Sequence, residues 1–122
     1  MDNIEILEYT GSGYNRTMNF EQWRVAIANY AQIFDEKYFD KIERHMLTDE
    51  VFVLLMGKAT LVIGKQMHRY PLEQGKIYNV KKGEWHNILI EKDAKVLIVE
   101  NHNTGPENTE YYYFRGNKNE QI

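Results

Sequence analysis

Short apolar runs alternate with glycine-containing polar turns over most of the chain. The runs are rich in β-branched and aromatic residues, and they cover residues 51–56, 59–64, 76–80, 85–91, 95–100 and 109–114. Runs of this length and composition, bounded by turn residues, are typical of β-strands. The pattern therefore predicts an all-β domain. The Gly57-Lys58 dipeptide between the first two runs predicts a hairpin turn.

One segment, residues 20–34, fits two patterns. Its large apolar residues recur at helical spacing, with Asn19 in position to cap a helix, at Phe20, Trp23, Ile27, Tyr30 and Phe34. Trp23, Val25 and Ile27 also alternate with polar Arg24, as they would in a strand. The sequence leaves open whether this segment is a short helix before residue 40 or a strand.

Composition narrows the classes of function. The 122 residues are expected to form one domain over residues 1–114, followed by a polar tail at 115–122. A net charge of −3 offers no basic face for nucleic acid, and the absence of cysteine excludes thiolate metal sites. The longest apolar run, residues 51–56, is too short to cross a bilayer, and the acidic opening segment lacks the features of a secretory signal. We therefore expect a cytoplasmic protein with neither nucleic-acid nor membrane partners.

Carboxylates and histidines stand close to the starts of the apolar runs. In an extended segment Glu43 and His45 point to the same face, because strand side chains alternate. Glu50 opens the run at 51–56, with Asp49 beside it as an alternative carboxylate, and His86 follows a glycine turn. These side chains are therefore candidates for one polar site at the ends of several strands.

The residues that follow Glu50 and His86 in the same two apolar runs predict an apolar wall beside that site. Residues on the same strand faces as Glu50 and His86 are Phe52, Leu54, Ile88 and Ile90, and Tyr78 and Lys82 are candidate rim contacts. Trp85 should point away from the pocket if His86 points into it. Of the other histidines, His68 is expected on a sheet face and His102 in a polar loop.

These spacings resemble the two motifs of the cupin superfamily. His45, Glu50 and Gly57 stand at the spacing of the first motif, in which Glu43 replaces the first histidine. Gly75, Gly83 and His86 stand at the spacing of the second motif. The chain departs from the motifs in three further places, where Lys37 replaces a glycine, Lys81 a proline and Ile90 an asparagine. The resemblance covers residues 40–100 and is more specific for the fold than for the chemistry.

The resemblance implies a small cupin-like antiparallel β-barrel, a jelly roll of two packed sheets, with a metal site. The metal ligands of the family map onto Glu43, His45, Glu50 and His86. Two imidazoles and one or two carboxylates suit a divalent metal such as Fe, Mn, Ni or Zn. Glu43 has two possible roles, as a fourth metal ligand or as a catalytic acid or base beside the metal.

Three classes of function remain open. The first is a metal-dependent enzyme on a small molecule, either an isomerase or epimerase of sugar-like compounds or a dioxygenase. The second is a non-enzymatic barrel that binds a small-molecule ligand, and the third is a metal-free barrel in which His45 and His86 are hydrogen-bonded core residues. A homodimer is expected, because exposed sheet edges and the aromatic residues at 111–114 need cover.

Overall fold

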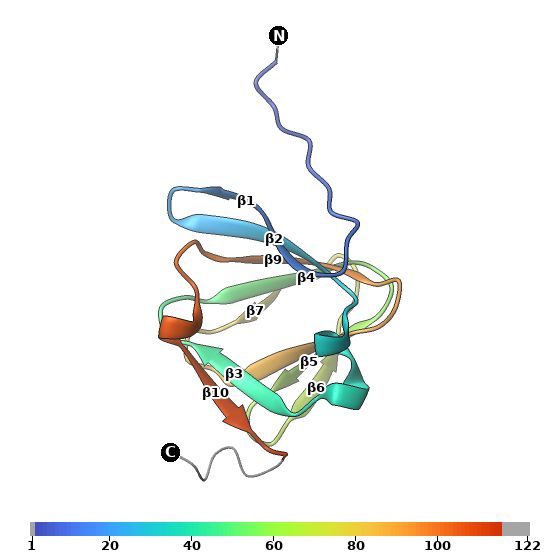
Figure 1. The fold of residues 1–122 in the computed structure, drawn as a ribbon, viewed down its shortest axis with the longest axis vertical. Helices are drawn as coiled ribbons and strands as arrows, with labels where there is room; N and C mark the ends of the chain where they lie inside the picture. The colour runs from blue at the N-terminus through green and yellow to red at the C-terminus, as the bar shows by residue number, and fades with distance from the viewer. Residues whose placement is uncertain (1, 116–122) are drawn as a thin grey trace.

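The computed structural model describes residues 2–115, in which ten strands form two five-stranded antiparallel sheets (Figure 1). The first sheet has the order β1 (Gly13–Phe20), β2 (Trp23–Asn29), β9 (Lys95–Asn101), β4 (Glu50–Met56) and β7 (Tyr78–Val80). The second has the order β10 (Thr109–Tyr113), β3 (Lys41–His45), β8 (His86–Ile90), β5 (Ala59–Ile63) and β6 (His68–Pro71). The chain is all-β, as predicted, and the two sheets face each other as the resemblance to a jelly roll implies (Figure 1). Of the predicted polar tail, residues 116–122 lie outside the described part of the chain.

The turn at Gly57 connects the two sheets. Its flanking strands β4 and β5 belong to different sheets, so the predicted hairpin at Gly57-Lys58 is wrong. The chain passes close to Ala94 here, since a Cβ on Gly57 would lie 2.6 Å from the Ala94 Cα. Gly57 also has a φ of 76°, in the left-handed region that favours glycine. Both features explain why a glycine ends the first motif.

Residues 20–34 form strand β2 followed by a short 3₁₀ turn. Strand β2 pairs with β1 and β9 along its length, which satisfies its backbone groups on both sides. Its buried face is made by Arg24, Ala26 and Ala28, whereas Trp23 is 45% exposed. The helical interpretation is therefore wrong, and the helical elements among the described residues before residue 40 are the short 3₁₀ turns η1 (Gln32–Phe34) and η2 (Glu36–Tyr38). Within residues 2–115, no helix has the length and apolar character needed to cross a membrane.

The main core fills the space between the two sheets. The four residues predicted to share an inward face are all buried, namely Phe52, Leu54, Ile88 and Ile90. Burying side chains of this size contributes about 1.5–3 kcal/mol each. The inward prediction is confirmed, and it places the polar ends of the same strands against one interior space.

A second apolar cluster lies on the outer face of the second sheet. Ile42, Val62 and Leu89 are buried there, and Trp85 and Tyr112 pack against them. Trp85 therefore points away from the interior, as predicted. His68 is exposed on the edge strand β6, as predicted for a sheet-face histidine.

Candidate metal centre and ligand cavity

A cavity of about 310 Å³ opens between the two sheets and gathers the polar side chains. Alternation along the strands supplies most of its walls, because every second residue points inward. Strand β3 contributes Lys41, Glu43 and His45, while β4, β8 and β9 contribute polar and apolar residues in turn. The lining from these three strands comprises Glu50, Phe52, His86, Asn87, Ile88, Ile98 and Glu100. This volume lies within the range of small-molecule sites.

His45 and His86 converge on one oxygen of Glu50. The distance from Glu50 Oε1 is 3.0 Å to His45 Nε2 and 2.9 Å to His86 Nε2. The two imidazole rings lie edge to face, with centroids 5.1 Å apart. All three residues are buried, and Glu50 is only 6% exposed. Residues from three strands and both motifs therefore meet at a single point.

The outer nitrogens of both imidazoles are occupied. His86 Nδ1 lies 2.9 Å from the carbonyl oxygen of Glu84, which can only accept, so Nδ1 carries the hydrogen. His45 Nδ1 lies 2.9 Å from Thr109 Oγ1. Such outer contacts fix ring orientation in metal sites and leave Nε2 free as the ligand atom. The donor set therefore fits a divalent metal.

Glu43 lies at the same site but is held less tightly. Its Oε2 is 3.4 Å from His45 Nε2, and its side chain is 28% exposed. One ligand atom each from Glu43, His45 and His86 falls within 4.8 Å of the others, a spacing that one metal ion can bridge. Burial raises the pKa of Glu43, and the two histidines only partly offset this effect. Glu43 is thus placed either to bind a metal or to carry a proton.

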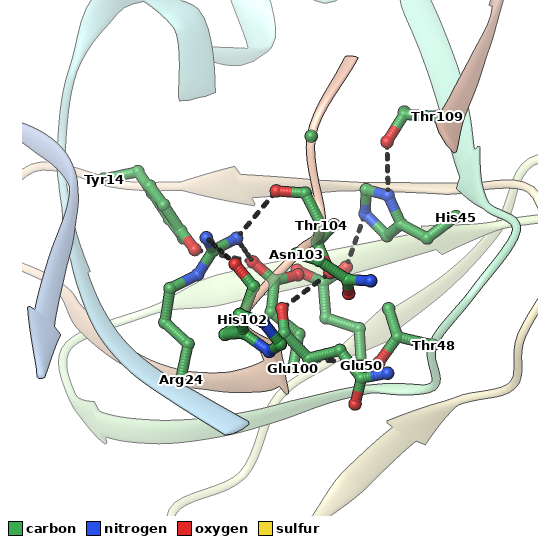
Figure 2. A network of polar contacts seen from close by, with 12 residues as sticks. Tyr14, Arg24, His45, Thr48, Glu50, Glu100, His102, Asn103, Thr104 and Thr109 are labelled. Atoms are coloured by element: carbon green, nitrogen blue, oxygen red, sulfur yellow. Dashed lines mark hydrogen bonds and ion pairs between the residues drawn. The ribbon is translucent and has the colours of Figure 1, made fainter. Parts of the chain in front are cut away.

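Glu100 is a third carboxylate at the centre that the sequence interpretation missed. One ligand atom each from His45, Glu50 and Glu100 also falls within 4.8 Å of the others. Figure 2 shows Glu50 and Glu100 side by side, between His45 and Arg24. Glu100 Oε1 accepts hydrogen bonds from Arg24 Nη2 at 2.8 Å and from the Tyr14 hydroxyl at 2.5 Å. Its Oε2 is buried with no hydrogen-bond partner among the described residues.

Arg24 is anchored from several sides. Besides Glu100, it donates to the backbone carbonyls of His102 and Thr104, each at 3.1 Å (Figure 2). The side chain is 3% exposed, so Arg24 and Glu100 form a buried ion pair. Through these carbonyls Arg24 also fixes the loop that follows β9 and closes one side of the cavity.

The pKa values at the centre are set mainly by the interactions of Glu50 with His45 and His86. Burial opposes the ionisation of Glu50, but hydrogen bonds from His45 and His86 outweigh it and hold the pKa of Glu50 well below its usual range. Burial likewise disfavours charged imidazoles, but Glu50 outweighs it and raises the pKa of His45 and of His86. Burial, together with the charge of Glu50, raises the pKa of Glu100. Without a metal, the arrangement therefore favours the ionised form of Glu50 and makes both histidines easier to protonate than free imidazoles.

Other candidate residues lie away from the centre. The Asp49 carboxylate accepts from Asn79 Nδ2 and the Lys82 backbone, so Glu50 and not Asp49 enters the cavity. Neither Tyr78 nor Lys82 lines this cavity, and the predicted rim contacts are wrong. His102 lies in the turn after β9, where its carbonyl holds Arg24.

Solved structures of low sequence identity share this architecture. A cupin-2 domain protein from Shewanella frigidimarina aligns with 77% of this chain and 85% of its own, at 16% identity and a TM-score of 0.59. The second structure is an RmlC-like cupin with a double-stranded β-helix fold, from Methanocaldococcus jannaschii. The alignment covers 80% of this chain and 90% of that protein, at 13% identity and a TM-score of 0.60. This chain has the cupin fold. No family model and no curated protein matches the sequence.

Among the cupin-fold structures is an enzyme from Streptomyces. The Pac13 variant with uridine aligns with 95% of this chain and 95% of its own, at 8% identity and a TM-score of 0.63. Pac13 is described as a nucleoside dehydratase. At this identity the likeness concerns the cupin fold alone.

Proposed function

We propose that this protein binds a divalent metal ion through His45, His86 and Glu50 and acts on a small polar molecule in the cavity. The supporting observation is the convergence of both Nε2 atoms on Glu50 Oε1, with both Nδ1 atoms held by other groups. Two imidazoles and one carboxylate suit Fe, Mn, Ni or Zn. A metal so held supplies Lewis-acid polarisation of a substrate oxygen.

In this proposal Glu43 is the catalytic acid or base. Its side chain is more exposed than that of Glu50, and its carboxylate lies farther from His45 Nε2, at 3.4 Å against 3.0 Å. A raised pKa suits proton transfer near neutral pH. The reaction class is therefore a proton transfer on a carbonyl or hydroxyl compound, such as isomerisation or epimerisation. Dioxygenation needs no such carboxylate and is the less supported of the two chemistries.

A metal-free cupin is the second candidate. The distances of 2.9 and 3.0 Å from Glu50 to the two imidazoles are also those of hydrogen bonds from protonated histidines. Protons would then balance the carboxylate instead of a metal. In that case the cavity either binds a ligand without reaction or catalyses by acid–base chemistry alone.

Metal content distinguishes these candidates. The protein is purified without chelators or metal-affinity tags, and metals are measured by elemental analysis in the wild type and in His86→Ala. His68→Ala is the matched control, because His68 is exposed on β6. We expect about one equivalent of metal in the wild type and in the control, and none in His86→Ala. No metal in any of the three proteins would refute the metal-dependent function.

We also propose a cytoplasmic homodimer. Strands β1, β7, β10 and β6 are sheet edges, and exposed edges are commonly covered by a second subunit. Light scattering at micromolar concentration tests the dimer, and a monomeric mass would contradict it.

A further inference from the structure

We propose that the ligand of this cavity carries an anionic group, a carboxylate or a phosphate, held at the mouth by Arg16 and Lys41. The inference deepens the proposed function and rests on it in taking this cavity as the substrate site. It concerns which molecules bind, and it holds whether a metal or protons balance Glu50.

The cavity has a buried inner end and an exposed mouth. At the inner end, His86 is 3% exposed and Glu50 and Glu100 are each 6% exposed. Toward the mouth, Tyr14 is 37% and Tyr111 is 41% exposed. Arg16 is exposed, and Lys41 is half-buried. A ligand entering the cavity therefore meets Arg16 and Lys41 before it reaches the imidazoles.

Charges at the inner end are balanced among themselves. Arg24 pairs with Glu100 at 2.8 Å. Glu43 and Glu50 both face the His45 imidazole, and either a divalent cation or two imidazolium protons would neutralise them. Lys41 feels the charge of Glu43 at longer range, but no carboxylate of the inner end forms an ion pair with Lys41 or Arg16 among the described residues.

Arg16 lies on β1 two residues from Tyr14, and both line the cavity. Within residues 2–115 the Arg16 guanidinium forms neither a hydrogen bond nor an ion pair. A guanidinium that is charged, unpaired and directed to a ligand cavity is suited to bidentate recognition of a carboxylate or phosphate.

Lys41 supplies a second cation from the opposite sheet. It lies on β3 two residues before Glu43, and both line the cavity. Its ammonium lies 5.4 Å from the ring centroid of Tyr111 and 5.7 Å from that of Tyr113. Cation–π contacts hold the ammonium in place without cancelling its charge, and it forms no ion pair within the described residues. Arg16 and Lys41 thus give the mouth of the cavity a positive charge, although the whole protein has a net charge of −3.

Matched pairs of anionic and neutral probes test this inference. Thermal shift and calorimetry compare glucose 6-phosphate with glucose, lactate with 1,2-propanediol, and inorganic phosphate alone. The proteins are the wild type, Arg16→Gln, Lys41→Gln and the double variant. Lys58→Gln is the control, because it removes the same charge from the exposed turn between β4 and β5. Metal content is measured on every protein.

We expect the anionic member of at least one pair to bind at least tenfold more tightly than its neutral partner. This preference should fall at least tenfold in each single variant and persist in Lys58→Gln, with metal content unchanged throughout. Equal binding of anionic and neutral probes, or equal losses in Arg16→Gln and Lys58→Gln, would overturn the inference. An anion preference in a protein without metal would support it and refute the metal-dependent function. Bound metal without an anion preference would overturn this inference and leave the metal-dependent function standing.

Discussion

Glu43 on β3 lies directly opposite His86 on β8, so the replaced position of the first motif and the histidine of the second are cross-strand partners. Tyr111 of β10 lies opposite Glu43 on its other side. The three side chains form a row across the second sheet, and all of them line the cavity. A carboxylate at position 43 therefore adds an acidic group beside an imidazole and under the exposed mouth.

Glu43→Gln separates the two roles of this residue. If Glu43 transfers protons and does not bind the metal, the variant keeps the isosteric contact and binds metal about 10–100-fold more weakly at most. Metal titration of the variant against the wild type and His86→Ala checks this expectation. Loss of metal as complete as in His86→Ala would make Glu43 a ligand.

Arg24→Ala should be strongly destabilising. The substitution leaves Glu100 buried without its cation, a change that costs about 3–5 kcal/mol. Arg69→Ala breaks the exposed ion pair with Glu36 and should cost less than about 1 kcal/mol. Urea denaturation of both variants measures the difference. Similar losses for the two would show that Arg24 does not stabilise the buried carboxylate.

Gly57→Ala should destabilise the fold more than Gly75→Ala. Both glycines have positive φ, which costs about 1–2 kcal/mol for alanine. Only at Gly57 would the new Cβ meet backbone, 2.6 Å from Ala94 Cα, whereas nothing lies within 4 Å of a Cβ at Gly75. The close approach should add about 1–3 kcal/mol. Equal denaturation midpoints would mean that the turn between the sheets moves freely.

The stability of the metal-free protein should fall as pH rises above about 6.5. The raised pKa values of His45 and His86 stabilise the fold fully below the unfolded-state value of about 6.5, and this contribution disappears as pH rises through the folded-state values. Metal binding has the opposite dependence, because ligand imidazoles must be neutral. Chelator-treated protein should therefore lose stability as pH rises above about 6.5, while stabilisation by added metal grows. Thermal denaturation with and without metal checks both trends. If the metal-free stability is unchanged in this range, the Glu50 interaction is not made by charged histidines.

The fold and part of the centre were predictable because strand alternation is a local property. The spacing from Glu50 to Gly57 reflects the inward-facing strand β4 and the turn that ends it, and His45 is the last residue of the preceding strand β3. Since alternate residues share a face, the same spacing also predicted the buried positions of Phe52 and Ile88. The β4–β5 turn was misassigned because a Gly-Lys dipeptide looks the same whether it joins strands of one sheet or of two.

Glu100 and Arg24 were missed because neither belongs to a sequence motif. Each is a charged residue on the otherwise apolar inward face of its strand. Glu100 follows Val96 and Ile98 on the inward face of β9, and Arg24 precedes Ala26 and Ala28 on that of β2. A charge on an apolar face is a signal that could have been read. Its meaning depends on the β2–β9 register, which places Arg24 opposite Glu100 and is not visible in either segment alone.

The most direct test of the account is a crystal structure of metal-loaded protein, with anomalous data collected at the absorption edge of that metal. We predict one anomalous peak inside the cavity, bonded by the Nε2 atoms of His45 and His86 and by the Glu50 carboxylate. No peak in the cavity of a protein soaked with Mn or Zn, or a peak only at a surface residue such as His68, would contradict the account.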